Sequence, residues 1–308
     1  MKYRRLGKTE LTVSVVGVGT WQFGGEWGKD FQQDEVDAMF ARAKELGINL
    51  LDTAECYGDH LSEEFCGRAI KGQRDDWIVA TKFGHKFHSP FERDTVYDLD
   101  KVREQLELSL KALQTDHVDL YQFHSGPDEC FDTDGLWEML NRFKEEGKVR
   151  HLGTSIGSND NIYQTDKSDE VGSEAIQVVY NRLNKTPENR VFDSCIRQNL
   201  GVLARVPLAS GYLSGKYDEN STFDDNDVRG KWHSDEQTRE SIRKAIEIKK
   251  NEVPDGVDMA QWALGWCLQH PAVTCVIPGC KNVEQVESNA AAADLEMVRD
   301  DHPQAVNG

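Results

Sequence analysis

The stretch DEVDAMFARAKELGINLLDTAECYG, residues 34–58, contains a predicted helix, a predicted strand and the polar segment that follows the strand. Apolar residues in Asp34–Leu46 recur three and four positions apart, which is typical of an amphipathic helix, and Gly47 stands where a left-handed helix end is expected. Ile48–Leu51 is short and mostly apolar, as expected of a buried strand. Polar residues begin directly after this strand, at Asp52.

The same alternation of short apolar stretches and longer amphipathic ones continues along almost the whole chain. It predicts strands at Val15–Val18, Ile48–Leu51, Ile78–Thr81, Val118–Phe123, Val149–Leu152, Ala175–Tyr180, Val202–Arg205 and Thr274–Ile277. Further helices are predicted at Asp100–Leu113, Gly135–Glu146 and Pro187–Asn199, with Gly147 and Gly201 as left-handed helix ends. Strands that alternate with helices indicate β-α-β units and a parallel sheet. Eight of them predict an α/β protein that forms a single (β/α)₈ barrel, or TIM barrel, over residues 1–308.

Two segments lie outside this repeat. Lys2–Val13 is predicted to form a small N-terminal β-hairpin around Gly7 and Lys8. Tyr217–Gln237, which is rich in Asp, Asn and Gly, is predicted to be a long loop beside the mouth of the barrel. Loops of this length are more often functional than idle, so we expect this one to cover a bound cofactor, with a solvated connector as the alternative. A short helical tail is expected after Ala293.

The composition excludes several classes of protein. Lys and Arg total 36 against 54 Asp and Glu, a formal charge of -18, which opposes binding to the phosphate backbone of nucleic acids. No apolar stretch approaches the roughly 18 residues that span a bilayer. The N-terminal residues show no secretion signal, and the seven cysteines are dispersed, as expected of reduced thiols. We therefore expect a cytoplasmic protein that binds neither nucleic acid nor membrane. Its acidity fits a salt-rich cytoplasm as well as an ordinary one.

Four chemically active side chains follow predicted strands. Asp52 and Tyr57 follow the second strand, Lys82 follows the third and His124 the fourth. Because the carboxyl ends of the strands of a parallel barrel meet at one mouth, these four residues are expected to lie together there. Each of them taken alone has an ordinary structural explanation, such as capping, packing or solvation.

Together the four residues would form a group that transfers a proton. A tyrosine has an ordinary pKa of about 10, and the nearby ammonium of Lys82 would lower it. Asp52 would keep Lys82 protonated, while His124 would donate a hydrogen bond to a carbonyl oxygen or strengthen Tyr57 as an acid. The alternative is a metal site built from Asp52, Glu55 and His124. The charge of Lys82 opposes that site, and no metal is expected.

The motif Asp-Thr-Ala-x-x-Tyr-Gly at residues 52–58, with the strand-end Lys82 and His124, resembles the catalytic tetrad of the aldo-keto reductase family. The resemblance extends over nearly the whole chain, from GVGTW at residues 17–21 to VIPG at residues 276–279. The C-terminus lacks the long substrate loop of the mammalian monomeric members. The chain is therefore most similar to the bacterial branch that is related to potassium-channel β subunits.

The resemblance implies an NADP(H)-dependent oxidoreductase that reduces aldehydes or ketones to alcohols, or catalyses the reverse reaction. Hydride would pass between the nicotinamide and the carbonyl carbon, and Tyr57 would protonate the oxygen. Much of the rate gain would come from donors aimed at that oxygen, Tyr57 and His124 above all.

The resemblance also implies where the cofactor binds. Ser155 and Gln177 would hold the nicotinamide carboxamide, although Ile156 stands where the family has Asn. Arg205 would stack its planar guanidinium on the nicotinamide, with a structural ion pair as the alternative role. The other residues implied in cofactor binding are Thr20, Trp21, Asp52, Pro207, Leu208, Ser210, Gly211, Lys216, Arg229, Gly279, Lys281, Gln285 and Asn289.

Lys281, Lys216 and Arg229 bring positive charge to an otherwise acidic chain, which favours NADP(H), with NAD(H) still possible.

The expected partner is a small carbonyl compound or sugar, and the sequence leaves the oligomeric state open. Aromatic walls are usual for small-ligand sites. The candidate wall residues are Trp21, Trp27, Tyr57, Phe87 and Trp232.

Two other functions fit parts of the same sequence. One is an NADPH-binding redox sensor or regulatory subunit with little turnover, which would also retain the four strand-end residues. The other is a hydrolase or isomerase on the same barrel. It would need metal ligands or a carboxylate pair in place of the Tyr and Lys, and the sequence shows neither.

Overall fold

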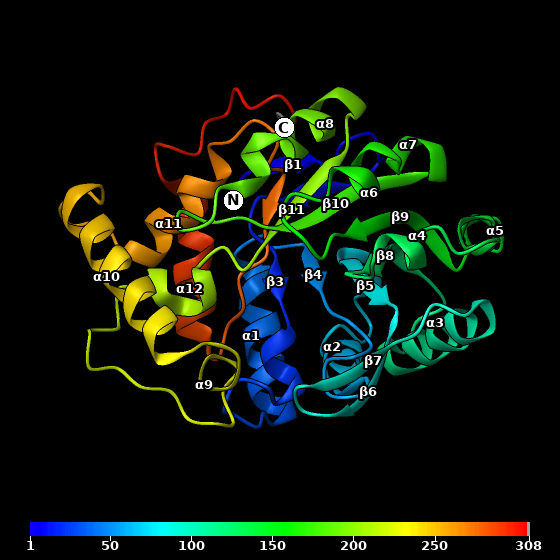
Figure 1. The fold of residues 1–308 in the computed structure, drawn as a ribbon, viewed down its shortest axis with the longest axis horizontal. Coiled ribbons are helices and arrows are strands. Elements are labelled where there is room, and N and C mark those ends of the chain that lie inside the picture. The colour runs from blue at the N-terminus through cyan, green and yellow to red at the C-terminus, as the bar shows by residue number, and fades with distance from the viewer. Residues whose placement is uncertain (307–308) are drawn as a thin grey trace.

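The computed structural model describes residues 1–306 as a barrel of eight parallel strands surrounded by helices (Figure 1). The strands are neighbours in chain order: β3 (Val18–Gly19), β4 (Leu50–Asp52), β5 (Ile78–Phe83), β8 (Val118–His124), β9 (Val149–Ser155), β10 (Ser173–Val179), β11 (Gly201–Arg205) and β12 (Cys275–Val276). Bridges from Val16 to Val276 and from Gly19 to Gly279 join the first strand region to the last. The barrel is therefore closed, and the predicted fold is confirmed.

Helices connect the strands and cover the outside of the barrel. The α-helices are α1 (Gln33–Glu45), α2 (Leu61–Ala69), α3 (Leu99–Leu113), α4 (Asp128–Phe131), α5 (Leu136–Glu145), α6 (Ile162–Asp166), α7 (Ser168–Val171), α8 (Val191–Gln198), α9 (Val228–Trp232), α10 (Asp235–Asn251), α11 (Met259–Leu268) and α12 (Val283–Ala291). Short 3₁₀ helices lie at Trp21–Gly24, Arg74–Asp76, Thr186–Asn189, Ala209–Ser214 and Ala292–Asp294. Within residues 1–306, none of the helices is both long and apolar enough to cross a membrane.

Three glycines are predicted to end helices with a positive φ, and this prediction is wrong for one of them. Gly47 and Gly147 follow α1 and α5 with φ of 81° and 75°, as expected. After α8 the left-handed residue is Asn199, with φ 51°, and Gly201 instead begins β11. Gly201 serves close packing, because a Cβ atom there would lie 2.4 Å from Leu6 Cδ1.

The predicted helix Pro187–Asn199 is interrupted near its start. Residues 186–189 form a 3₁₀ turn, and α8 begins only at Val191. The break lies at Arg190, whose φ of -150° is incompatible with a continuous helix.

The predicted N-terminal hairpin is present and closes the lower end of the barrel, which is the end where the strands begin. It consists of β1 (Tyr3–Arg5) and β2 (Thr12–Ser14), which pair antiparallel. Apolar side chains of the hairpin share one buried cluster with inward-facing residues of the strands. That cluster comprises Leu6, Leu11, Val13, Leu50, Ala80, Leu120, Ala175, Leu203, Cys275 and Ile277. A polar site therefore has room only at the opposite end, where the strands finish.

Two connections at that opposite end differ from simple loops. A second hairpin, β6 (His85–Ser89) and β7 (Glu92–Thr95), follows β5 and was not predicted. The predicted loop Tyr217–Gln237 is shorter than expected, because it contains α9 and because α10 begins at Asp235. The side chains of Ser234 and Gln237 form a capping box there, which starts the helix.

The predicted helical tail is wrong beyond Asp294, because residues 295–306 contain no helix. The chain instead returns to the N-terminal hairpin, at the end of the barrel where the strands begin. Arg5 N donates to Gln304 O at 2.7 Å, and Val306 N donates to Tyr3 O at 3.0 Å. These bonds satisfy the outer edge of β1, which would otherwise be unpaired.

Arg4 fixes this lower end of the barrel, and its removal should be costly. Arg4 is 2% exposed, and its guanidinium donates to Val273 O at 2.7 Å and to Leu268 O at 3.0 Å. Arg4→Met leaves two buried carbonyls without donors, so the free energy of unfolding should fall by about 2–5 kcal/mol in urea denaturation. Arg5→Met is the matched control at a half-exposed neighbour and should change it by only about 0.5 kcal/mol. Equal losses in the two variants would contradict this role of Arg4.

Candidate active site

The structure brings the four strand-end side chains together at the mouth of the barrel. Lys82 Nζ, on β5, lies 2.6 Å from Asp52 Oδ1 and 3.2 Å from Tyr57 OH. It also donates to Thr53 O at 2.7 Å. His124, the last residue of β8, has its ring centroid 6.1 Å from that of Tyr57. Lys82 is fully buried, and the other three residues are at most 9% exposed.

A tight turn after β4 presents Tyr57 to this mouth. Tyr57 N donates to Ala54 O, and Gly58 N donates to Cys56 O, at 3.1 and 3.0 Å. Gly58 has a φ of 70°, which favours glycine. Gly24 packs against the same turn, because a Cβ atom on it would lie 2.7 Å from the Tyr57 carbonyl carbon. The two glycines therefore allow the close approach that holds the tyrosine in place.

Two glutamines inside the barrel hold the second oxygen of Asp52. Gln177 Nε2 and Gln122 Nε2 donate to Asp52 Oδ2 at 2.7 and 3.1 Å. Gln177 Nε2 also lies 3.1 Å from Gln122 Oε1. Gln177 is expected to bind the cofactor, which stays a prediction, and the structure shows it in contact with Asp52. Gln122 was not predicted, although a buried amide in the apolar strand β8 was an available signal, since such a group needs a partner.

The electrostatics of Tyr57 differ from the expectation. Burial disfavours the phenolate more than Lys82 favours it, so the pKa of Tyr57 is raised to about 12 instead of being lowered. Burial also disfavours the ammonium of Lys82, but Asp52 and Tyr57 more than offset it, and the pKa of Lys82 lies above its ordinary value. Burial, together with the charges of His85 and Lys82, holds the pKa of His124 well below its ordinary range. Near pH 7, Tyr57 is therefore protonated and His124 is neutral.

A cavity of about 860 Å³ lies over these residues. Tyr57, His124 and Asp52 form part of its wall. All the residues implied in cofactor binding line it except Ser155: they are Thr20, Trp21, Asp52, Gln177, Arg205, Pro207, Leu208, Ser210, Gly211, Lys216, Arg229, Gly279, Lys281, Gln285 and Asn289. Residues that are far apart in the sequence therefore border one space, as the barrel topology requires.

Several buried polar groups at or beside the cavity lack partners in the described part of the chain, and two of them lie where the nicotinamide is expected. One is Ser155 Oγ, at the end of β9, and the other is Arg205 Nε, at the end of β11. Arg205 Nη2 donates to the main-chain oxygen of Ile156 at 3.2 Å, and this contact with a carbonyl does not support the ion-pair alternative. Buried unsatisfied donors are costly, so both groups are suited to a ligand.

The main chain is also unusual along the expected pyrophosphate loop. Ala209, Ser210 and Gly211 have consecutive positive φ angles of 48°, 56° and 91°. Successive turns of this kind can direct main-chain N–H groups toward an anion. The loop lines the cavity through Ser210 and Gly211, with Lys216 close behind in the chain.

The far end of the cavity is organised around the start of α12. Asn282 caps this helix by accepting from Gln285 N at 2.9 Å, and Gln285 Oε1 accepts from Lys281 N at 2.9 Å. Lys281 Nζ donates to Trp27 O at 2.6 Å, and burial lowers the pKa of this lysine. Asn289 Nδ2 donates to Gly279 O at 3.4 Å. The expected adenosine-binding residues thus form one connected corner.

Arg229 does not provide the free positive charge that was expected of it. Its Nε and Nη2 donate to the two oxygens of Asp227 at 2.8 and 2.6 Å, and its Nη1 donates to Tyr217 OH at 2.6 Å. The guanidinium also lies over the Phe223 ring, at 3.9 Å from the centroid. Arg229 therefore holds the loop of residues 217–232 together, and Asp227 balances its charge.

That loop crosses the cavity and bonds to the segment on its other side. Trp27 and Asp227 form a β-bridge, Gly28 N donates to Asn226 O at 3.1 Å, and Val228 N donates to Glu26 O at 2.9 Å. Residues 226–228 therefore form a strap that would enclose a ligand lying in the cavity, as the expected covering role of the loop requires.

Aromatic side chains wall the part of the cavity near Tyr57. The Trp21 ring centroid lies 5.1 Å from that of Trp27 and 5.7 Å from that of Trp232. Phe87, which was expected in this wall, does not line the cavity. His85 and Arg93 line it instead, from the β6–β7 hairpin. They were missed because only the folding of the hairpin brings them over the mouth. The available signal was the turn sequence SPF, residues 89–91.

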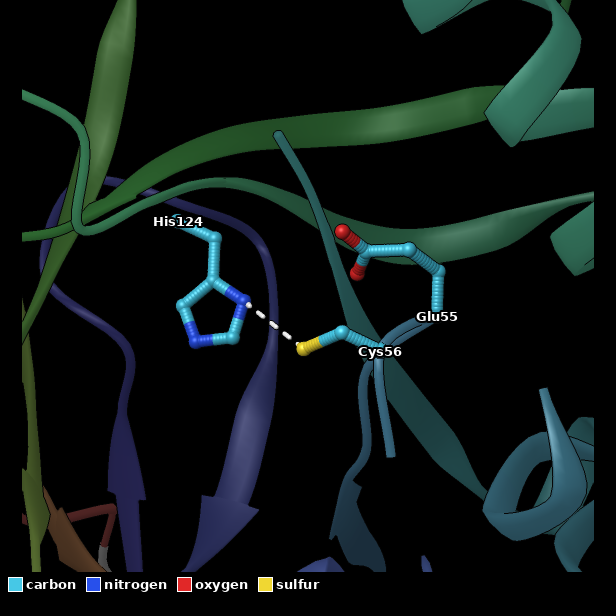
Figure 2. A group of neighbouring side chains, drawn as sticks. All are labelled: Glu55, Cys56 and His124. Atoms are coloured by element: carbon cyan, nitrogen blue, oxygen red, sulfur yellow. Dashed lines mark hydrogen bonds between the residues drawn. The ribbon is translucent and has the colours of Figure 1, made fainter. Parts of the chain in front are cut away.

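Glu55, Cys56 and His124 lie next to one another (Figure 2). Their potential metal-ligand atoms are all within 4.8 Å of one another. His124 Nδ1 lies 3.7 Å from Cys56 Sγ. The guanidinium of Arg93 lies on the same sulfur, with Nη1 3.1 Å away, so its positive charge would oppose a divalent cation there. The alternative metal site of Asp52, Glu55 and His124 is disfavoured too, because both carboxylate oxygens of Asp52 already accept hydrogen bonds from other side chains.

Comparison with known proteins agrees with this arrangement. The model of the Aldo/keto reductase family matches residues 15–306. The chain is 32% identical over 309 residues to the uncharacterized oxidoreductase YqkF of Bacillus subtilis (strain 168), across 99% of this chain and 95% of that protein. It is 28% identical to a probable voltage-gated potassium channel subunit beta of Arabidopsis thaliana, across 96% and 92% of the two chains. The expected relation to channel β subunits is therefore confirmed.

A solved structure shows the same fold. The holo form of the aldo-keto reductase AKR11C1 from Bacillus halodurans superimposes with a TM-score of 0.79 at 29% identity, across 96% of this chain and 91% of that one. With the closed barrel and the strand-end side chains, these matches show that the chain belongs to the aldo/keto reductase family and has the general role of an oxidoreductase.

Proposed function

We propose that this protein interconverts a small carbonyl compound and its alcohol with NADP(H), and that Tyr57 donates and accepts the proton. The observation that carries the proposal is the position of Lys82 Nζ, 2.6 Å from Asp52 Oδ1 and 3.2 Å from Tyr57 OH. Lys82 is fully buried behind these two residues, which both line the cavity. An ammonium in this position stabilises the phenolate that forms when Tyr57 gives up its proton.

The cavity suits a nicotinamide dinucleotide at both ends. Ser155 Oγ and Arg205 Nε are buried without partners where the nicotinamide is expected, and Lys216 and Lys281 supply positive charge toward the phosphates. When bound, this cofactor would supply hydride to the carbonyl carbon or accept it from the alcohol. The strap formed by residues 226–228 would keep water away from the reacting atoms.

The roles of the four side chains follow from their charge states. Tyr57 is protonated near neutral pH and serves as the acid in carbonyl reduction. Lys82 stabilises the resulting phenolate, and Asp52 keeps Lys82 charged and oriented. His124 is neutral, and since its Nδ1 faces Cys56, its Nε2 is the ring nitrogen left to donate to the carbonyl oxygen.

The raised pKa of Tyr57 predicts an asymmetric dependence on pH. Carbonyl reduction uses protonated Tyr57, which predominates at every pH below about 12, so kcat/KM for reduction should vary little between pH 6 and 9. Alcohol oxidation uses the phenolate, whose fraction grows about tenfold per pH unit below that pKa. Initial rates of oxidation should therefore rise steadily over the same range. A plateau of the oxidation rate below pH 8 would contradict this assignment.

Tyr57→Phe should lower kcat for reduction by about 10² to 10⁴, because it removes the proton donor and leaves the aromatic wall intact. NADPH oxidation followed by absorbance with a panel of aldehydes and ketones measures the loss. Quenching of tryptophan fluorescence checks that NADPH still binds.

The matched control is Tyr121→Phe, which removes a buried hydroxyl that has no partner in the described structure. This control should keep native activity. Retention of most activity by Tyr57→Phe, at full cofactor occupancy, would rule out the proposed role of the tyrosine.

Lys281→Ala tests the preference for NADP(H). A charged hydrogen bond to the 2′-phosphate is worth about 1.5–3 kcal/mol, so the Kd for NADPH should rise at least about tenfold while that for NADH changes little. Lys29→Ala is the control, since Lys29 Nζ contacts Lys281 O and Glu35 at the surface without lining the cavity. Equal losses for NADPH and NADH in Lys281→Ala would refute the assignment.

A redox sensor or regulatory subunit is the second candidate function. The strap of residues 226–228 bonds directly to residues 26–28 across the cavity, which favours long retention of a bound cofactor. NADPH binding without turnover in either direction, over the whole panel of substrates, would make this the better description.

A further inference from the structure

The guanidinium of Arg93 borders the cavity close to the reacting groups, yet the proton-transfer mechanism does not use it. Arg93 belongs to β7, lines the cavity, and has 17% of its side chain exposed. Its Nη2 donates to Glu26 Oε1 at 3.2 Å, and its Nη1 lies 3.1 Å from Cys56 Sγ. A guanidinium carries five N–H donors, and these two contacts leave others for a ligand.

Contacts with neighbouring side chains hold this guanidinium in place. Glu26 is fully buried and also accepts from Trp21 Nε1. The Trp232 ring lies over the guanidinium, at 5.8 Å from its centroid to Arg93 Cζ. Because the side chain is already ordered, a hydrogen bond from it to a ligand costs little further conformational entropy.

The distances place Arg93 within reach of a short substrate. Cys56 Sγ lies 3.1 Å from Arg93 Nη1 and 3.7 Å from His124 Nδ1, so the guanidinium and the imidazole flank the same sulfur. A carbonyl compound held at Tyr57 and His124 could therefore direct a second oxygen, a few bonds away, to Arg93. The indole of Trp21 would pack against the carbon chain between them.

We propose that Arg93 is a substrate-recognition residue that binds an oxygen atom other than the reacting carbonyl, and that the preferred substrates are small hydroxylated aldehydes or ketones. This inference rests on the proposed function. Glu26 balances the charge of Arg93, so the site favours a neutral hydroxyl oxygen over a carboxylate. His85, on the same hairpin, is neutral near pH 7 because burial and Arg93 lower its pKa to about 4, and it adds no charge to attract an anion.

The test compares two substrates with the same carbon skeleton, glyceraldehyde and propanal. The ratio of their kcat/KM values should favour glyceraldehyde in the native protein and fall by about tenfold to a hundredfold in Arg93→Met, because the hydrogen bonds to the hydroxyl oxygens are lost. A merely structural role for Arg93 would lower both rates and leave the ratio unchanged. Lys86→Met, at an exposed position on the same hairpin, should change neither rates nor ratio.

Arg93→Lys guards against misfolding, because it keeps a positive charge beside the buried Glu26 while removing the planar fork of donors. The ratio should fall in this variant too. An unchanged ratio in both Arg93 variants would overturn the proposal. A parallel comparison of succinic semialdehyde with butanal tests the charge argument, and an Arg93-dependent preference for the carboxylated compound instead of glyceraldehyde would overturn the choice of a neutral oxygen.

Binding separates this inference from the proposed function. If the native protein binds NADP⁺ but turns over nothing, the proposed reductase function fails while Arg93 can still be tested by ligand-observed NMR with glycerol and 1-propanol. Preferential binding of glycerol that is lost in Arg93→Lys would support the recognition role. Equal binding of the two alcohols, or no dependence on Arg93, would overturn it.

Discussion

The buried ion pair between Lys82 and Asp52 is the interaction on which the site depends. An ammonium with no exposed surface is tolerated inside a protein only when a carboxylate and further hydrogen bonds replace the lost water. Here the carboxylate lies 2.6 Å away, a main-chain carbonyl accepts a second hydrogen bond, and two glutamine amides hold the other oxygen of Asp52. Strands β4, β5, β8 and β10 each contribute one of these side chains. The strands are therefore tied together at the mouth of the barrel by the same ion pair that contacts the hydroxyl of Tyr57.

The two ends of the barrel have separate tasks. The lower end is filled with apolar side chains and sealed by the N-terminal hairpin and the returning C-terminal segment. The upper end keeps its polar side chains, because the strands finish there and the loops can surround a ligand. Several loop regions border the cavity, among them the segment around Trp27, the β6–β7 hairpin, the loop that contains Ser210 and Gly211, and the turn before α12. The strap of residues 226–228 bonds to residues 26–28 across it. The loops thus form the walls of the cavity, whereas the strands supply the ion pair.

Much of the fold and the centre of the site followed from local patterns. Periodicity located the eight strands, and the polar residues after the second, third and fourth strands were expected to meet. The predictions that were wrong share a cause: each concerned a property that depends on contacts made only in the folded chain. The pKa of Tyr57 rises because the effect of burial is larger than that of Lys82. The charge of Arg229 is balanced by an ion pair with Asp227. The tail after Asp294 is not helical because it bonds to β1, some 290 residues earlier in the chain.

By itself, the sequence determined the (β/α)₈ architecture and the identity of the four residues at the strand ends. Both depend on hydrophobic period and on spacing, which are properties of short stretches. The tertiary structure alone decided that Gln122 and Gln177 hold Asp52, that His85 and Arg93 enter the cavity in place of Phe87, and that the strap closes over it. The physical reason is that burial, hydrogen-bond partners and the balance of charge arise only when segments far apart in the chain are packed together.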